Sequence, residues 1–179
     1  MSWRLVLLLP TFAIALFAAS CGGGANALGA AISMPKDQFA LEDPIPIDII
    51  LKNVSSEPQT VNARLAVNDK EAPAPFREVT MRIKMPSGEE AMFRIDLRIG
   101  PPGPADFQGL EPGQSIERTE DIAELYFLDQ KGEYEVTVIY ENTLSGPSVL
   151  DATSGEITQE DIGAEKGKNT SNTLTFTIE

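Results

Sequence analysis

Histidine is absent from this 179-residue chain, and cysteine occurs only once, as Cys21. Without histidine, the chain lacks the side chain that most often serves as a general acid or base and as a transition-metal ligand. A single cysteine excludes both an internal disulfide and a zinc site built from several thiolates. The composition therefore predicts a protein that is not an enzyme and that holds no metal or other cofactor.

Basic residues are scarce as well: 14 Lys and Arg stand against 27 Asp and Glu, giving a formal net charge of −13. Arg4 is the only charged residue among the first 20, so removing that segment would change the net charge from −13 to −14. An excess of negative charge repels nucleic acids and anionic membrane surfaces. We therefore expect no nucleic-acid partner.

A long hydrophobic run is also missing, because the apolar stretch Leu5 to Ala19 is short for a membrane span. It matches instead the apolar region of a secretory signal. Cys21 follows Ala18-Ala19-Ser20, and this junction resembles a bacterial lipobox, which implies a signal peptide at 1–20 and lipidation of Cys21. The alternative is an ordinary signal peptide with Cys21 incidental. The glycine-rich segment 21–27 is predicted to be a flexible tether.

The lipobox resemblance also bears on location. It implies attachment to a membrane through the lipid on Cys21 and hence a place in the cell envelope. Gly22, rather than an aspartate, follows the cysteine. By resemblance to enterobacterial lipoproteins, this favours the outer membrane or the cell surface.

Helical periodicity is nearly absent from residues 28–179, whereas apolar and polar residues alternate repeatedly. Alternation at period two is typical of half-buried strands. Turn signals rich in Gly, Pro, Asn and Ser separate these stretches, and no internal repeat or second core is visible. The pattern predicts one all-β domain, an immunoglobulin-like antiparallel sandwich of about seven strands. The alternating stretches are 28–34, 45–51, 61–67, 79–85, 93–99, 134–140 and 172–179.

The stretch from Leu110 to Asn142 organises this fold. It predicts a short strand, one helical turn and a long strand that opens with Gly132-Glu133-Tyr134. Gly-x-Tyr-x-Val at such a position is typical of a tyrosine corner, in which the hydroxyl bonds the backbone a few residues upstream. We therefore predict a structural role for Tyr134. Tyr126 is placed on the helical turn, where replacement by phenylalanine should be better tolerated.

The stretches 79–85 and 93–99 flank a Pro-Ser-Gly turn and predict a β-hairpin. With Met85 opposite Ala91, both apolar faces agree, and Arg82 then lies opposite Arg94. The outward face carries a candidate partner-binding stripe for a polyanionic or acidic partner. The alternative is a charged sheet surface that protects against aggregation. The stripe consists of Arg82, Lys84, Arg94 and Arg98.

One group of carboxylates could supply calcium ligands and another an acid–base pair, but both are interpreted as solvated surface. The sequons at Asn53 and Asn169 are interpreted as turns. The calcium candidates lie in the segment 143–171, for which ion binding and disorder both stay open. The groups are Asp151, Glu156, Glu160, Asp161 and Glu165, and Glu111, Glu117, Glu120, Asp121 and Glu124.

A family resemblance rests on Phe107, Leu110-Glu-Pro-Gly-Gln-Ser, Asp121-Ile122, Tyr126 and Gly132-x-Tyr-x-Val. Together these motifs resemble the immunoglobulin-like domain that precedes the catalytic domain of deuterolysin-type and peptidyl-Lys metalloendopeptidases. The resemblance covers roughly 28–179, and the HExxH motif of those peptidases is impossible without histidine. We expect a non-catalytic cell-envelope lipoprotein that binds or scaffolds a protein or polyanionic partner. The alternative is a protease-regulating module, acting as an inhibitor or a detached pro-domain of a metalloendopeptidase.

Overall fold

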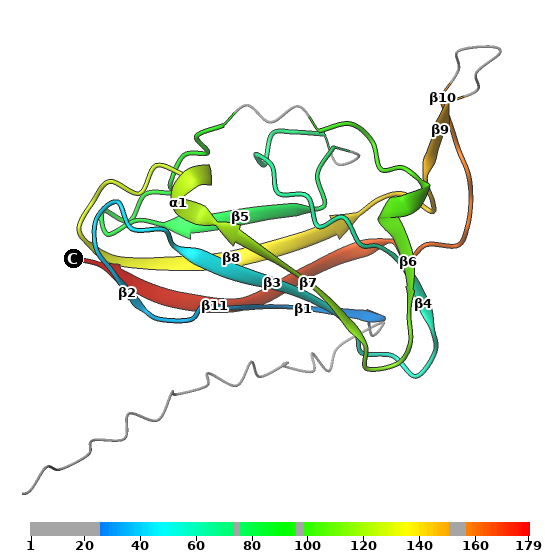
Figure 1. Ribbon diagram of the computed structural model, residues 1–179, viewed down its shortest axis with the longest axis horizontal. Coiled ribbons are helices and arrows are strands. Elements are labelled where there is room, and N and C mark those ends of the chain that lie inside the picture. Colours follow the sequence, from blue (N-terminus) through cyan, green and yellow to red (C-terminus); the bar gives the residue numbers. More distant parts are fainter. Residues whose placement is uncertain (1–25, 74–75, 96–98, 151–156) are drawn as a thin grey trace, which may run out of the picture.

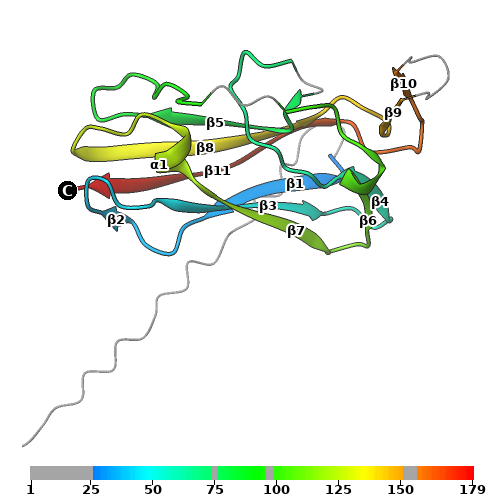
Figure 2. The same cartoon turned by 45° about the horizontal axis from the view of Figure 1, so that its top comes forward.

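The computed structural model describes residues 26–73, 76–95, 99–150 and 157–179. Within them, two larger sheets pack face to face as a sandwich, which confirms the predicted all-β class (Figures 1 and 2). One sheet has the order β1-β3-β7 and the other β2-β11-β8-β5, so seven strands form the two layers. Their bounds are β1 (Leu28–Ser33), β2 (Gln38–Phe39), β3 (Pro46–Asn53), β5 (Val79–Lys84), β7 (Ser115–Asp121), β8 (Gly132–Asn142) and β11 (Gly167–Ile178).

Shorter elements lie at the margins of the sandwich. Two small antiparallel ladders pair β4 (Gln59–Asn62) with β6 (Phe107–Leu110) and β9 (Ser148–Leu150) with β10 (Ile157–Gln159). A 3₁₀ turn spans Pro104–Asp106, and one helical turn, α1 (Ile122–Leu125), follows β7. In the larger sheets every pairing is antiparallel except that of β2 with β11.

The core forms where the apolar faces of the two sheets meet. In β3, Ile47, Ile49 and Leu51 are buried and alternate with partly exposed residues, as the sequence pattern predicts. In β8 the buried face carries Tyr134, Val136, Val138 and Tyr140. Burying such side chains contributes about 1.5–3 kcal/mol each, so this double face supplies much of the driving force for folding.

The tyrosine corner is confirmed at the start of β8. The hydroxyl of Tyr134 donates to the backbone oxygen of Gln130 at 2.7 Å and accepts from its N–H at 3.1 Å. Gly132, two residues earlier, has φ +131°, and a Cβ there would lie 2.9 Å from Pro86. Because glycine has no Cβ, the backbone at the start of β8 can lie directly against the side chain of Pro86.

Tyr126 corrects one expectation. Asp121 caps α1 by accepting from the N–H of Ala123, and the same oxygen accepts from the N–H of Ile45 just before β3. Tyr126 follows this turn with its side chain buried, and its hydroxyl donates to Met81 O at 3.2 Å. Met81 lies on the edge strand β5. The hydroxyl of Tyr126 is therefore buried and bonds a strand carbonyl that lies 45 residues earlier in the chain. It is not exposed on a surface turn.

We now expect Tyr126→Phe to lower the free energy of unfolding at least as much as Tyr134→Phe, each by about 1–3 kcal/mol. Each change deprives a backbone carbonyl of a donor, and the carbonyl of Met81 is the more deeply buried. Urea melts with an unchanged denaturant slope would measure the loss. A neutral Tyr126→Phe beside a costly Tyr134→Phe would restore the original ranking.

Asn172 closes the seam between the two sheets. The register of β11 against β8 shifts between Thr170 and Thr173, where a bulge turns Asn172 toward β1. The side chain of Asn172 accepts from Ile32 N–H at 2.9 Å and donates to Ile32 O at 3.1 Å. One carboxamide thus stands in for a peptide group and links β11 in one sheet to β1 in the other.

The predicted hairpin is wrong beyond its turn. The bridge that follows β5 joins Lys84 to Glu90, two residues out of the expected register, and only Ala91 continues it by donating to Ile83 O. Past Ala91 the chain leaves β5 and pairs with residues 125–127 instead. Arg82 faces Thr137 of β8. Arg94 bonds Leu125 O instead of β5, so the expected Arg82–Arg94 pairing does not form.

Two further boundaries differ from the expectation. The third predicted strand ends at Asn62, and Leu65 turns the chain with φ +48°, although its side chain is buried. The last strand begins at Gly167, five residues early, which places Asn169 inside β11 and not in a turn. Asn53 does form the expected turn, because its side-chain oxygen accepts from Ser55 N–H at 2.9 Å.

A buried ion pair fastens the segment after β4 to the start of β5. Both oxygens of Glu78, which is 2% exposed, accept from Arg64, at 2.5 Å and 2.9 Å. Asn62 and the N–H of Ala66 donate to the same carboxylate, each at 3.0 Å. Arg64 also donates to Gly100 O at 2.6 Å. This network holds three separate chain segments together.

Candidate functional site

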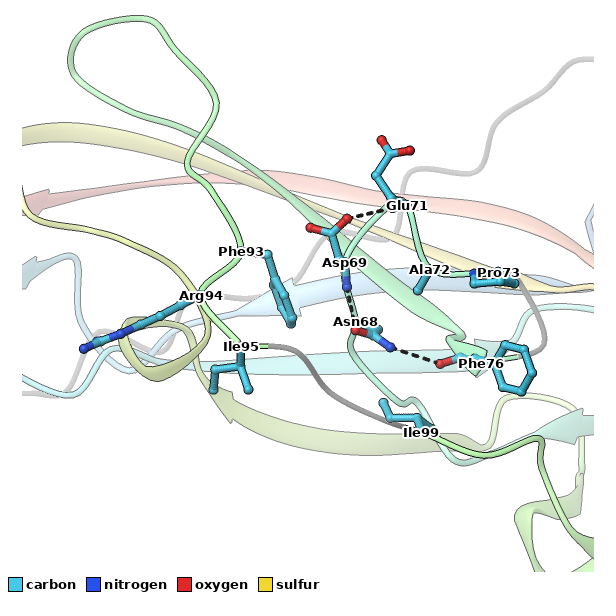
Figure 3. A pocket seen from close by; sticks show the side chains of 10 residues that line it. All are labelled: Asn68, Asp69, Glu71, Ala72, Pro73, Phe76, Phe93, Arg94, Ile95 and Ile99. Carbon is cyan, nitrogen blue, oxygen red and sulfur yellow. Dashed lines mark hydrogen bonds between the residues drawn. The ribbon is translucent and has the colours of Figure 1, made fainter.

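A solvent-open hollow of about 660 Å³ lies beside β5, lined by residues from 68–73, 76, 93–95 and 99 (Figure 3). Figure 3 shows Phe93 and Ile95 on one side of it, with Asn68, Asp69 and Phe76 on the other. Its lining is mainly apolar. The residues are Asn68, Asp69, Glu71, Ala72, Pro73, Phe76, Phe93, Arg94, Ile95 and Ile99.

Local hydrogen bonds shape the wall that contains residues 68–72. Asn68 is anchored to β5, since its N–H donates to Val79 O at 3.1 Å. Its side-chain oxygen accepts from Asp69 N–H at 2.9 Å, and Asp69 accepts in turn from Glu71 N–H at 2.7 Å. Successive side-chain-to-backbone turns of this kind are characteristic of Asn and Asp. They give the acidic wall a defined conformation.

The opposite wall is a short strand-like segment attached to the end of α1. Arg94 N–H donates to Leu125 O at 2.7 Å, and Phe127 N–H donates to Met92 O at 3.0 Å. The rings of Phe93 and Tyr126 meet edge to face at 5.1 Å between centroids. The guanidinium of Arg94 lies 5.5 Å from the centre of the Phe127 ring. These contacts fix the orientation of the wall.

Apolar side chains are exposed around this wall. Met92 is 69% exposed, Phe127 45% and Ile95 38%. Single exposed apolar residues are ordinary, but a contiguous group beside a hollow marks an interaction surface. All three lie within two positions of the bridged residues Phe93 and Tyr126, so exposed apolar surface is concentrated beside the hollow.

A second hollow of about 310 Å³ shares Asp69, Glu71 and Phe93 with the first. We call the two together the Phe93 groove. Lys70 and Glu90, which line the second hollow, form an ion pair at 2.8 Å, and this contact raises the pKa of Lys70. No ion pair among the described residues involves Asp69 or Glu71, although both lie close enough to Lys70 to contribute to its raised pKa.

The predicted basic stripe is divided in the structure. Arg82 and Lys84 are exposed on β5, where Arg82 lies 4.0 Å from Glu90 and Lys84 lies 3.5 Å from Glu135. Arg94 lines a different hollow, with no lining residue in common with theirs. Arg98 lies outside the described residues. The prediction assumed that these residues form one continuous row on a hairpin, and the described ones do not form such a row. Binding of a partner by these residues stays a prediction.

The carboxylate groups do not converge either. Glu111 lies before a turn, Glu117 and Glu120 are on β7, Asp121 caps α1 and Glu124 is exposed. Asp151 and Glu156 lie outside the described residues. Across the described ranges, no three Asp, Glu, Cys or His side chains come together as an ion would require.

The Phe93 groove was not anticipated from the sequence, which placed the stretch 93–99 in a β-hairpin with 79–85. One feature of the sequence argued against that hairpin. The connector Gly100-Pro-Pro-Gly-Pro directly follows the stretch 93–99, and its prolines cannot donate the hydrogen bonds of a regular β-ladder.

The predicted signal peptide and lipid anchor, including Cys21, lie outside the described residues. Within residues 26–73, 76–95, 99–150 and 157–179, no helix is long and apolar enough to span a membrane. The likeness to the metalloendopeptidase domain stays a prediction that rests on the motifs alone. No protein-family model matches the chain, and no curated protein matches it.

Proposed function

We propose that this protein is a non-catalytic cell-envelope lipoprotein, anchored through Cys21, whose β-sandwich binds a protein partner in the Phe93 groove. The observation that carries the proposal is an apolar groove open to solvent, with Met92, Ile95 and Phe127 exposed beside it. Binding sites are typically concave and mostly apolar, with a few polar groups that set specificity. The groove has this composition.

The position of the groove also suits a tethered module. The first residue of β1, Leu28, pairs with the last residue of β3, Asn53. The tether therefore enters the sandwich at the end where β3 finishes. The bridge of Phe93 with Tyr126 lies next to α1, near the opposite end of the sandwich (Figure 1). A domain attached through residues 21–27 would therefore hold this part of the groove away from the membrane.

Site-specific photocrosslinking would test the binding role. A benzoylphenylalanine at position 95, in the groove, should crosslink to a discrete partner in the cells that produce the protein. The same probe at Thr175, on the exposed face of β11, serves as control. Equal crosslinking at both positions would contradict groove binding. A metalloendopeptidase as the crosslinked partner would favour the protease-regulating role.

The anchor has its own test. Acyl chains contribute about 0.8 kcal/mol for each buried methylene, so the several chains of a bacterial lipoprotein hold a protein firmly in a bilayer. We expect Cys21→Ser to yield an unprocessed or soluble protein that lacks the mass of the lipid. Fractionation and intact-mass measurement would show this. A mutant that stays in the membrane fraction with unchanged mass would overturn lipidation.

A further inference from the structure

We infer that the Phe93 groove takes an extended segment of a partner protein that alternates apolar residues with Lys or Arg, and that this segment adds as a strand beside Phe93. The inference rests on the proposed binding function and specifies the chemistry of its occupant. Three features of the groove support it: a free backbone edge, two adjoining apolar hollows and an acidic wall.

The backbone edge follows from the bonding pattern around the Phe93–Tyr126 bridge. The two bonds of this antiparallel bridge come from the flanking residues, Arg94 N–H to Leu125 O and Phe127 N–H to Met92 O. In such a pair the N–H and C=O of the central residue point away from the partner strand. No bond between described residues uses these two groups of Phe93. They form an open edge of the kind to which an extended peptide adds.

The neighbouring edge of β5 is different, because its carbonyls already have donors. Val79 O accepts from Asn68 N–H, Met81 O from the Tyr126 hydroxyl and Ile83 O from Ala91 N–H. Three segments therefore cover the edge of β5. An incoming strand would find its backbone partners at Phe93 instead.

The two hollows supply places for side chains. Phe93 lines both, and their volumes are about 660 Å³ and 310 Å³. In a strand, every second side chain points the same way. Two apolar side chains of one added strand could thus enter the two hollows, one beside Phe76 and Ile95 and the other beside Met81 and Met92.

The acidic wall determines the charge of the occupant. Asp69 and Glu71 line both hollows. Two cations lie among them: Lys70 lines the second hollow, where it pairs with Glu90, and Arg94 lines the first, with its guanidinium over the Phe127 ring. With Glu90 counted, three carboxylates face these two cations. The excess of acidic residues in the whole chain would add long-range attraction for a cationic segment. Lysine or arginine side chains alternate with the apolar ones and would point away from the hollows. Their long, flexible stems would reach Asp69 and Glu71 from the solvent side.

The probe is a fluorescently labelled, acetylated and amidated seven-residue peptide that alternates lysine with isoleucine, titrated against the purified full chain at low salt. We expect the double variant Asp69→Asn, Glu71→Gln to weaken binding roughly tenfold, and the difference to shrink at high salt. Asp69→Asn keeps an acceptor oxygen for the N–H of residue 71, so the turn is retained. The matched control, Glu111→Gln with Glu117→Gln, removes two exposed charges elsewhere and should change binding less than about twofold.

Two altered peptides test the remaining features. A peptide N-methylated on the residues facing Phe93 should lose binding, because it cannot form the main-chain bonds of an added strand. A peptide with glutamate in place of lysine should not bind. Equal weakening by both double variants, or equal binding of the glutamate peptide, would overturn the inference. If those results coincide with a groove-specific crosslink at position 95, the binding function holds and only the occupant is wrong.

Discussion

Replacing Glu78 with alanine is expected to lower the free energy of unfolding by about 3–5 kcal/mol. The carboxylate is almost completely buried and accepts from Arg64, Asn62 and the N–H of Ala66. Removing it takes this carboxylate away from the largely buried guanidinium and leaves the donors of Asn62 and Ala66 without their acceptor. Breaking a buried pair of this kind is strongly destabilising. A loss of this size is a large part of the 5–15 kcal/mol typical of a domain. Urea denaturation at neutral pH would measure it.

Two controls separate the buried pair from an ordinary surface pair. Lys84→Ala breaks the exposed contact with Glu135 and should change stability by about 0–1 kcal/mol. The double variant Arg64→Met, Glu78→Leu should recover part of the loss, because neither charge is then buried alone. If Glu78→Ala is no more damaging than Lys84→Ala, the network does not hold the segments together as described.

The second large effect is expected at alkaline pH. All three tyrosines of the chain, Tyr126, Tyr134 and Tyr140, have buried rings, and each hydroxyl donates to a backbone oxygen. Burial raises the pKa of Tyr126 and of Tyr140 well above the usual value near 10, and raises that of Tyr134 as well. The hydrogen bond of Tyr134 is only partly buried, so we expect its contribution to be smaller.

The direction follows from proton binding. Below pH 10 the folded and unfolded chains both keep the phenolic protons, and stability is unaffected by them. Above pH 10 the unfolded chain releases its protons while the fold retains them, so the free energy of unfolding falls as pH rises. The limiting slope is roughly 1.4 kcal/mol per pH unit for each such tyrosine.

Absorbance at 295 nm, where tyrosinate absorbs, would follow this transition directly. We expect almost no tyrosinate signal near pH 10 in the folded protein, and then a cooperative rise that coincides with loss of the circular dichroism signal. Tyr126→Phe should flatten the fall of stability with pH above pH 10. Reversible titration near pH 10 with the fold intact would show that these hydroxyls are accessible to solvent.

For the strands of the sandwich, the sequence was a reliable guide to what is buried. Alternation in β3 and β8 identified their inward faces, and Gly132-x-Tyr-x-Val identified the Tyr134 corner. Each of these signals is local. Whether every second residue is apolar decides which face meets the core, and a corner hydroxyl bonds only four residues upstream.

The candidate site depended on pairings that no local pattern specifies. Residues 93–99 alternate as well as β5 does, yet the described part of that stretch meets residues 125–127 and leaves Ile95 exposed. Alternation states that a strand has two faces without stating which segment lies beside it. The like-charge pair Arg82–Arg94 required by the predicted hairpin was a warning against that register.

The sequence by itself thus determined the all-β class, the inward faces of the main strands and the tyrosine corner, because these follow from residue spacing over a few positions. Only the tertiary structure decided the burial of Tyr126, the Arg64–Glu78 network and the Phe93 groove. Each of these depends on contacts between segments more than ten residues apart. Such contacts form when whole strands dock, since the free energy of burial and pairing is shared across the sandwich and not encoded in any one stretch.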